Sequence, residues 1–239
     1  MNIYHYIAFA MFGAFAAADF LLRARNFPGV TLWRTMGIIS TLLYFAIGTW
    51  SPFLWDSLLG QYQLVDATGL PFAVQLIAGF LLLEFGIYVW HRTMHNVTPL
   101  WRAMHQMHHS AERVDIWGAF YFHPLDMVGW AFLTSLCLVG GMGLSPEAAL
   151  VVNLMATFCS MFQHANIRTP RWIGYLVTRP ESHSLHHERD VHAWNYGDMP
   201  LWDMLFGTFR NPPAWNGEAG FHDGSSHKVV PLLLGAKIA

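Results

Sequence analysis

The sequence predicts an all-α fold: an integral membrane helical bundle of three spans plus a helical hairpin, with a cytosolic helical cap rich in histidine. Three observations predict this class. Hydrophobic residues make up 54% of the chain and charged residues only 12%, which is more apolar than an ordinary soluble domain. Several apolar stretches reach the roughly 20 residues that a helix needs to cross a bilayer. Of the 14 histidines, all except His5 follow residue 90.

The apolar stretches define the expected spans. Three of them cover residues 3–22, 35–55 and 70–90. A fourth, residues 127–162, is too long for one helix and is interrupted by Gly140, Gly141, Gly143 and Pro146, which are residues that end one helix and begin another. It therefore predicts a tight hairpin that enters and leaves on the same side of the membrane, so that the segments before and after it lie together.

The distribution of basic residues predicts the orientation. Arg23, Arg25 and Arg34 lie between the first two spans, whereas residues 51–71 contain no Lys or Arg. The positive-inside rule therefore places the first connection, and with it residues 91–125 and the chain after 163, in the cytoplasm. The short chain favours a bacterial inner membrane over the endoplasmic reticulum.

We expect one domain over residues 1–239. Its parts are membrane spans (1–90), a first histidine segment (91–125), the hairpin (126–163), a last histidine segment (164–210) and a loosely ordered tail (211–239). A net charge of −2 without a basic stripe excludes nucleic acid as a partner. Cys137 and Cys159 stand alone in apolar stretches and do not form a zinc or iron–sulfur motif.

Eight histidines form three short motifs, and their spacing is helical. The motifs are His91 and His95; His105, His108 and His109; and His183, His186 and His187. Residues three or four positions apart share one face of a helix, so each motif presents several imidazoles together. The topology places all three motifs on one side of the membrane. Isolated histidines such as His5, His222 and His227 are interpreted as ordinary polar residues.

The motifs indicate metal binding. Imidazole suits iron, zinc, copper and nickel, and eight histidines are twice what one tetrahedral site uses, so two metals are predicted. A hydrolytic zinc needs only about three protein ligands, and the excess of histidines favours redox iron. Two alternatives remain: a bis-histidine haem cytochrome for electron transfer, which predicts isolated histidines within spans, and a metal transporter, which predicts ligands near the bilayer midplane.

The chain also resembles a known family, the fatty acid hydroxylase/sterol desaturase family of membrane di-iron oxygenases. The resemblance covers about residues 84–210. It rests on residues 90–95 (WHRTMH), 100–110 (LWRAMHQMHHS), 122–124 (FHP), 163–166 (QHAN), 183–187 (HSLHH), 195–197 (NYG) and 201–209 (LWDMLFGTF).

The resemblance implies an O2-dependent di-iron oxidoreductase that hydroxylates or desaturates a C–H bond of a lipid, such as a sterol or fatty acyl chain. It implies two Fe ions, for which zinc can substitute in purified protein, with O2 as co-substrate. Electrons would come from a separate donor, a ferredoxin or a small cytochrome. The implied metal ligands are the eight motif histidines and His164, with His123 as a tenth ligand or as a hydrogen-bonding partner of one. His192 matches none of the family's motifs.

Two further expectations concern the surroundings of the histidines. Each ligating ring should pass its second N–H group to an acceptor, and the candidate acceptors are Glu84, Glu112, Asp115, Asp126, Glu188 and Asp190. Glu84 stands out because it lies within a span. The aromatic residues Trp117, Phe120, Tyr121 and Phe122 are interpreted as an interfacial belt in preference to the wall of a lipid channel.

Overall fold

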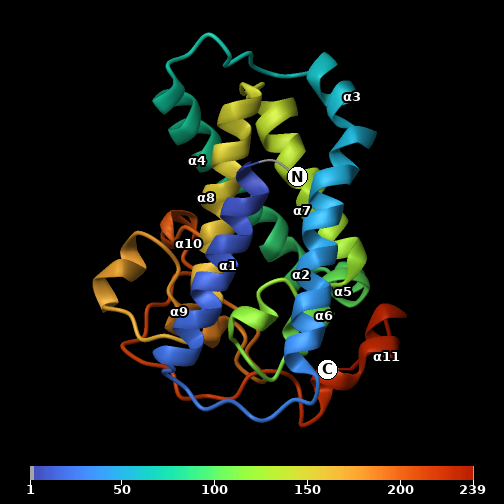
Figure 1. Ribbon diagram of the computed structural model, residues 1–239, viewed down its shortest axis with the longest axis vertical. Coiled ribbons are helices and arrows are strands. Elements are labelled where there is room, and N and C mark those ends of the chain that lie inside the picture. Colours follow the sequence, from blue (N-terminus) through green and yellow to red (C-terminus); the bar gives the residue numbers. More distant parts are fainter. Residues whose placement is uncertain (1–2, 239) are drawn as a thin grey trace.

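The computed structural model describes residues 3–238, and its regular elements in that range are all helical. Four helices are long and apolar enough to cross a membrane: α1 (Ile3–Leu21), α2 (Trp33–Trp50) with the turn that follows it to Leu54, α4 (Phe72–Asn96), and α7 (Pro124–Ser135) with the π-helical turn that extends it to Gly141. They run along the long axis of the molecule (Figure 1). The predicted membrane helical bundle is confirmed.

The third span is longer than its apolar stretch. The sequence predicts residues 70–90, but α4 continues as one helix to Asn96. His91 and His95 therefore lie on the last two turns of a membrane helix. A helix that is anchored in the bundle holds both side chains more rigidly than a loop would.

The predicted hairpin is also present. α7 and its extension rise away from the histidine end, and α8 (Pro146–His164) returns beside them (Figure 1). Gly143 makes the turn with a φ of 51°, a conformation that favours glycine. Pro146 opens α8 in the first turn, where its missing N–H costs nothing, and Ser145 caps the helix by accepting from the Ala148 N–H at 3.4 Å.

The bundle core lies between α4 and the hairpin. Leu83 and Ile87 of α4 pack with Leu138 of the extension of α7 and with Val152 of α8 in one buried cluster. α1 lies against α8, and α2 lies against α7. A short turn, Ile116–Gly118, fills the space between the lower parts of α1 and α2.

The cap is built from short elements at one end of the bundle (Figure 1). They are α5 (Thr98–Leu100), a π-helical turn (Trp101–His105), α6 (Gln106–His109), a 3-10 turn (Arg171–Tyr175), α9 (Pro180–His186), α10 (Leu201–Leu205), a second 3-10 turn (Ser225–His227) and α11 (Val229–Leu233). A further short helix, α3 (Asp56–Gln61), lies at the opposite end.

The tail is ordered by packing, and the expectation of a loosely ordered tail is wrong. Glu112 accepts hydrogen bonds from the Gly224 N–H (2.8 Å) and from the Ser226 hydroxyl (2.7 Å). Leu232 of α11 is buried against the first histidine segment, and Gln106 donates to the Ala236 carbonyl at 2.7 Å. The residues from 211 to 238 thus pack against α6 and the residues that follow it.

Candidate metal centre

Nine of the ten sequence-predicted site histidines converge at the junction of bundle and cap. Their side-chain nitrogens form two groups, and within each group the candidate ligand atoms lie within 4.8 Å of one another. The first group is His91, His95, His105, His109 and His186; the second is His108, His164, His183 and His187. We call them the five-histidine group and the four-histidine group. They adjoin, since the rings of His109 and His187 stack at 4.1 Å.

Helical spacing decides which histidines share a group. The pairs four residues apart, His91 with His95, His105 with His109 and His183 with His187, each enter one group together. In the two longer motifs the remaining histidine crosses over: His108 joins the four-histidine group and His186 the five-histidine group. Neighbouring helix residues diverge by about 100°, so adjacent histidines point to different groups.

The ligand nitrogens stand at distances that suit a shared metal. The Nε2 atom of His91 lies 2.9 Å from that of His105 and 3.1 Å from that of His186. In the four-histidine group, the Nε2 of His183 lies 3.1 Å from those of both His164 and His187. Two nitrogens bound at about 2.1 Å to one metal are about 3.0 Å apart in octahedral and about 3.4 Å apart in tetrahedral geometry.

The tautomers show that these contacts need a cation. The Nδ1 atoms of His91, His95 and His186 face backbone carbonyls at 2.7–2.8 Å, and a carbonyl only accepts, so each Nδ1 carries the proton. The Nε2 atom of each neutral ring then holds a lone pair. Lone pairs that point at each other in a buried site repel unless a positive ion lies between them, so the residues present fit a bound metal.

Burial keeps the rings neutral. It lowers the pKa of His105 to about 3 and those of His109 and His187 well below the usual value, because an imidazolium loses its hydration there. A neutral imidazole is the form that binds a metal. The centre is therefore arranged to bind metal ions rather than protons at neutral pH.

The two groups differ in how their outer nitrogens are held. In the four-histidine group only His164 has a partner for Nδ1, the Ser160 carbonyl at 2.7 Å. The Nδ1 atoms of His108, His183 and His187 are buried and have no hydrogen-bond partner among residues 3–238. The five-histidine group thus has the more rigidly oriented rings, and the four-histidine group has fewer ligands and more freedom.

A loop of backbone carbonyls orients the five-histidine group, and sequence reasoning missed it. The carbonyls of His192, Trp194 and Tyr196 accept from His95, His186 and His91. The chain aims three alternate carbonyls inward by adopting left-handed conformations at His192 (φ 40°), Trp194 (72°) and Asn195 (47°). Such conformations are uncommon outside glycine and asparagine. We call residues 192–196 the carbonyl loop.

The carbonyl loop is anchored by one carboxylate. Asp203 of α10 accepts from the N–H groups of Tyr196 (2.9 Å) and Gly197 (2.7 Å) and from the hydroxyl of Thr208 (2.6 Å). These contacts give a structural reason for the NYG and LWDMLFGTF motifs. The only sequence signal for the loop was that resemblance, since no residue type marks a backbone carbonyl.

Only one of the six candidate carboxylates contacts a site histidine. Asp126, fully buried at the start of α7, accepts from the Nδ1–H of His105 at 2.7 Å. Glu84 instead accepts from the Met199 N–H at 2.8 Å, and Glu188 accepts from Trp215. Asp115 binds Trp33 and Arg113, Glu112 holds the tail, and no hydrogen bond of Asp190 to a site histidine is present in the described range.

Because Asp126 accepts from His105, we expect substitutions of Asp126 to weaken metal binding, and to weaken it more when the acceptor oxygen is lost. Asp126→Leu leaves the N–H of His105 without an acceptor, and we expect the dissociation constant of the metal in the five-histidine group to rise about 10–100-fold. Asp126→Asn keeps an acceptor oxygen and should weaken binding less. Titration of the purified protein with a competing chelator measures both. Equal metal retention in wild type and Asp126→Leu would contradict the assigned contact.

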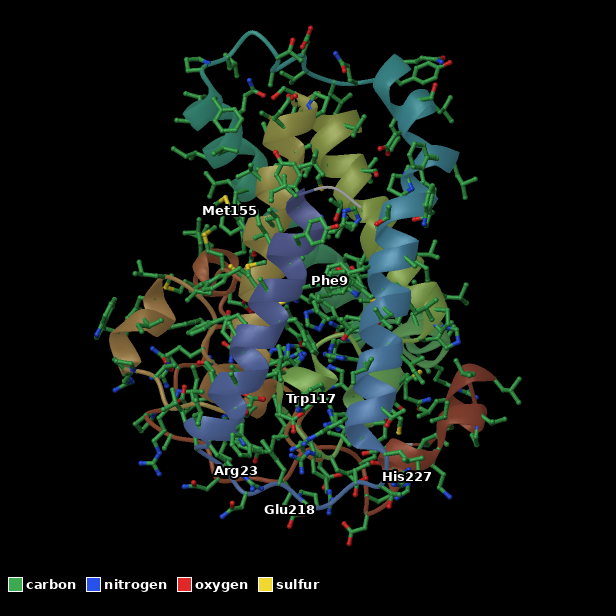
Figure 2. All side chains as sticks on the ribbon, in the orientation of Figure 1. Phe9, Arg23, Trp117, Met155, Glu218 and His227 are labelled. Atoms are coloured by element: carbon green, nitrogen blue, oxygen red, sulfur yellow. The ribbon has the colours of Figure 1, made fainter. Side chains whose placement is uncertain are left out.

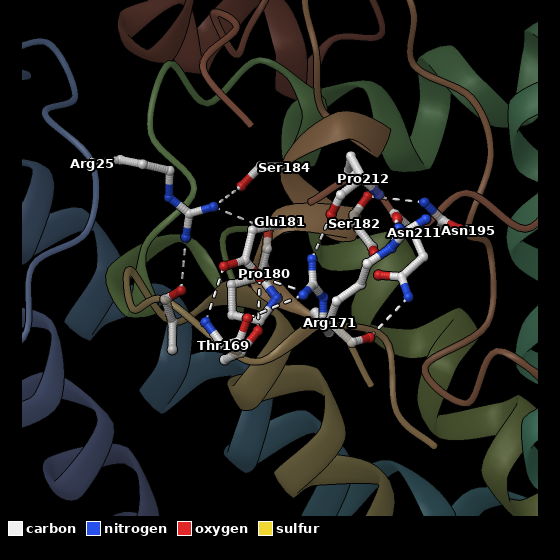
Figure 3. Close-up of polar contacts among 12 residues, drawn as sticks. Arg25, Thr169, Arg171, Pro180, Glu181, Ser182, Ser184, Asn195, Asn211 and Pro212 are labelled. Carbon is white, nitrogen blue, oxygen red and sulfur yellow. Dashed lines mark hydrogen bonds and ion pairs between the residues drawn. The ribbon is translucent and has the colours of Figure 1, made fainter. Parts of the chain in front are cut away.

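Two arginines, Arg25 and Arg179, fix α9, which carries the third motif; the contacts of Arg25 with Pro180 and Ser184 are drawn in Figure 3. Arg25, from the connection between α1 and α2, donates to the Pro180 carbonyl at 3.1 Å and to the Ser184 hydroxyl at 2.7 Å. Arg179 donates to the carbonyls of Thr169 (3.0 Å) and Pro212 (2.6 Å). These bonds tie α9 to the membrane bundle on one side and to the tail on the other.

His123 lies outside both groups. Its Nδ1 accepts from the Leu125 N–H at 3.0 Å as the cap of α7, and its Nε2 lies 3.3 Å from the Leu233 carbonyl. The structure therefore does not support a ligand role for it. His192, which the motifs did not place, touches the site: its Nδ1 lies 3.0 Å from Nδ1 of His109.

A cavity of about 60 Å³ opens beside the histidines on the bundle side. Histidines of both groups line it, together with Phe120, Phe122 and apolar residues of α4 and α8. Phe120 is 1% exposed and stacks on Tyr44, and Phe122 lies against His108 with ring centroids 4.3 Å apart. The interpretation of these aromatic residues as an interfacial belt is therefore wrong for Phe120 and Phe122, which form the wall of this cavity.

A membrane helical bundle that presents nine histidines, eight of them buried and His95 partly buried, in two adjoining groups is a membrane metalloprotein of the histidine-motif class. The chain belongs to the fatty acid hydroxylase family, whose family model matches residues 76–208. No solved structure matches the chain.

Curated relatives carry the resemblance further. The chain is 32% identical over 148 residues to an ornithine lipid hydroxylase of Rhizobium tropici, which covers 60% of this chain and 44% of that protein. It is 30% identical to a Delta(7)-sterol-C5(6)-desaturase of Nicotiana tabacum, in a match that covers 63% of this chain and 55% of that protein. It is 32% identical to the human alkylglycerol monooxygenase, in a match that covers 56% of this chain and 30% of that protein. The matched regions thus span about half or less of the relatives' own lengths.

Proposed function

We propose that the protein is a membrane di-iron oxygenase that hydroxylates or desaturates a C–H bond of a lipid, using O2 and electrons from a separate donor. The observation that carries the proposal is the pair of adjoining histidine groups, which line a cavity together with apolar and aromatic side chains and a few polar ones. Family membership supports it, because the matched relatives are named as lipid hydroxylases, desaturases and monooxygenases.

Nine neutral imidazoles would hold the two ions, five at one group and four at the other. The chemistry that bound iron supplies at such a site is the activation of O2 for attack on an unactivated C–H bond. Nitrogen ligands without a carboxylate also suit zinc, copper and nickel, so the choice of iron rests on the family and on the number of ligands.

The residues around the groups would position the lipid. His91 and His105 from one group and His108, His164 and His183 from the other all line the cavity. A lipid carbon placed there would therefore face the histidines of both groups, which would hold the ions. Phe120 and Phe122 exclude water and would contact the alkyl chain through apolar surface, which suits a substrate without charge at the reacting carbon.

The orientation and the donor form part of the same proposal. The basic residues favour a cytoplasmic cap, and we assign the protein to a bacterial inner membrane. A ferredoxin or a small cytochrome would then reach the cap from the cytoplasm and supply electrons.

The arrangement favours the oxygenase over a bis-histidine cytochrome. A haem iron takes two axial ligands with a porphyrin between them. Here the ligand nitrogens of each group lie within 4.8 Å of one another, which leaves no space for a porphyrin among them.

Metal analysis and product analysis together test the proposal. Protein extracted in mild detergent should contain about two irons per chain. Reduced, then exposed to O2 with a membrane lipid extract, it should yield lipids that have gained one oxygen atom or lost two hydrogen atoms. A His186→Ala, His187→Ala variant removes one ligand from each group and should lose both properties, whereas His222→Ala, at an exposed cap position, should retain them.

Three results would contradict the proposal. A haem absorption band would indicate the cytochrome. Metal near zero, or unchanged in the double variant, would remove the metal centre itself. Protein reconstituted with iron that consumes no O2 with any lipid of the extract would retain the metal site but not the reaction.

A further inference from the structure

A second, larger cavity lies between the lower ends of α1 and α2, away from the histidines. Its volume is about 700 Å³. The last turns of α1, the first turn of α2 and the segment from Arg113 to Trp117 form its walls. Figure 2 shows Trp117 between the two helices and Arg23 at the foot of α1. Residues that line the catalytic cavity do not line this one.

The cavity lies where the bilayer surface would be. The spans α1 and α2 both end at it, at Leu21 and Trp33. Phe20 (77% exposed) and Leu32 (69%) flank the opening with bare apolar surface, as residues that face lipid do. A ligand there would meet both the interfacial water and the acyl region.

Both acidic residues of the cavity are occupied by partners within the protein. Asp19 accepts from the N–H groups of Ile116 (2.8 Å) and Asn166 (2.6 Å). Asp115 accepts from the indole N–H of Trp33 at 2.8 Å and pairs with Arg113 at 2.7 Å. Both carboxylates therefore hydrogen-bond the cavity walls to one another.

Two of the three arginines in the cavity have no carboxylate partner in the described part of the chain. Arg23 donates from Nε to the Arg25 carbonyl at 3.3 Å and forms no ion pair there. The guanidinium of Arg34 forms neither a hydrogen bond nor an ion pair within residues 3–238, and it lies 5.8 Å from the centre of the Trp117 ring. Arg113, by contrast, is fully engaged.

We propose that this cavity binds the phosphate of a membrane lipid headgroup through Arg23 and Arg34, with the lipid's acyl chains lying against the exposed apolar side chains of Phe20 and Leu32. Guanidinium groups bind phosphate oxygens by charge-assisted, often bidentate hydrogen bonds. The volume accommodates a headgroup, and the exposed apolar flanks match its glycerol and first methylenes. The site is separate from the metal centre, so it stands or falls independently of the proposed reaction.

The positive-inside rule alone would place arginines on this side of the membrane, whether or not they bind phosphate. A charge-matched control distinguishes phosphate binding from this effect of membrane topology. Lys228 and Lys237 are exposed, lie on the same side and line neither cavity. Lys228→Gln, Lys237→Gln removes the same charge as Arg23→Gln, Arg34→Gln. Arg23→Lys, Arg34→Lys keeps the charge but loses the bidentate geometry.

The experiment is calorimetric titration of delipidated, metal-loaded protein in a neutral detergent. The probes are dioctanoyl phosphatidylglycerol, dioctanoylglycerol and inorganic phosphate. We expect the phosphatidylglycerol to bind, the Arg→Gln pair to raise its Kd at least about tenfold, the Arg→Lys pair to raise it less, and the Lys→Gln pair to leave it unchanged. Metal content and melting temperature verify that each variant is folded.

Several outcomes would overturn the proposal. Equal binding of dioctanoylglycerol would show that phosphate is not recognised. Inorganic phosphate that competes at the same concentration would make this a site for the free ion and not for a lipid. Equal weakening by the Lys→Gln pair would reduce the arginines to a topological role.

Discussion

Replacing His91 with alanine is expected to empty the five-histidine group and to stop lipid oxidation. The Nε2 of His91 lies 2.9 Å from that of His105 and 3.1 Å from that of His186, so this ring joins the second and third motifs to the first. Loss of an outer partner of a metal ligand commonly costs 10–100-fold in affinity or activity, and loss of a central ligand should cost more than about 100-fold.

The measurement is iron per chain together with turnover. His91→Ala should fall from about two irons to about one, because the four-histidine group keeps its full ligand set. His183→Ala, its counterpart in that group, should likewise lose about one iron, and Mössbauer spectra of the two variants should show the two different remaining sites. His222→Ala serves as the control. A His91→Ala protein that keeps both irons and its turnover would refute the assignment of ligands.

The spans and the histidine motifs were predictable because they depend on local properties. Hydropathy is summed over neighbouring residues, so the runs that became α1, α2 and α4 are visible without any tertiary information. The spacing of His91 and His95 specifies one helix face whatever the helix packs against. The hairpin followed from Gly143 and Pro146, whose backbone preferences are intrinsic.

How the motifs combine into two groups was not predictable in this way. Helical spacing separates His108 from His109, but it does not indicate that His108 joins His183 and His187 or that His109 joins His186. Which side each one faces depends on where α4, α8 and α9 lie around α6, and that placement arises from long-range contacts such as those of Arg25 with α9. His164 is a single histidine at the end of α8, and only the family resemblance drew attention to it.

The hydrogen-bond acceptors of the ligand histidines were the least predictable part of the site, because most of them are backbone carbonyls. Carboxylates are visible in a sequence, and they were the natural candidates for accepting imidazole N–H groups. Asp126 does so, but Glu84 binds a backbone N–H instead. Every residue carries a carbonyl, so the carbonyl loop has no compositional signal. Its left-handed residues His192 and Trp194 contradict local preferences, as functional sites often do.

The carbonyl loop gives the second large expectation, for Asp203→Asn. The carboxylate of Asp203 receives N–H groups from Tyr196 and Gly197 and a hydroxyl from Thr208. An asparagine turns one acceptor into an N–H donor that faces another donor, which should displace the loop. The carbonyl of Tyr196 then moves off His91, and we expect the metal dissociation constant of the five-histidine group to rise about 10–100-fold.

Glu112→Gln is a closely matched control for this prediction. Glu112 is also buried and also receives two N–H groups and one hydroxyl, from Gly224 and Ser226, but it holds the tail and not the carbonyl loop. Both variants should lower the melting temperature, since each loses hydrogen bonds to a charged acceptor. Only Asp203→Asn should release metal to a competing chelator. The carbonyl loop orients His91, His95 and His186, so a disturbed loop must weaken metal binding at the five-histidine group. Equal metal loss in the two variants would therefore show that Asp203 contributes only to the stability of the fold and does not position these ligands.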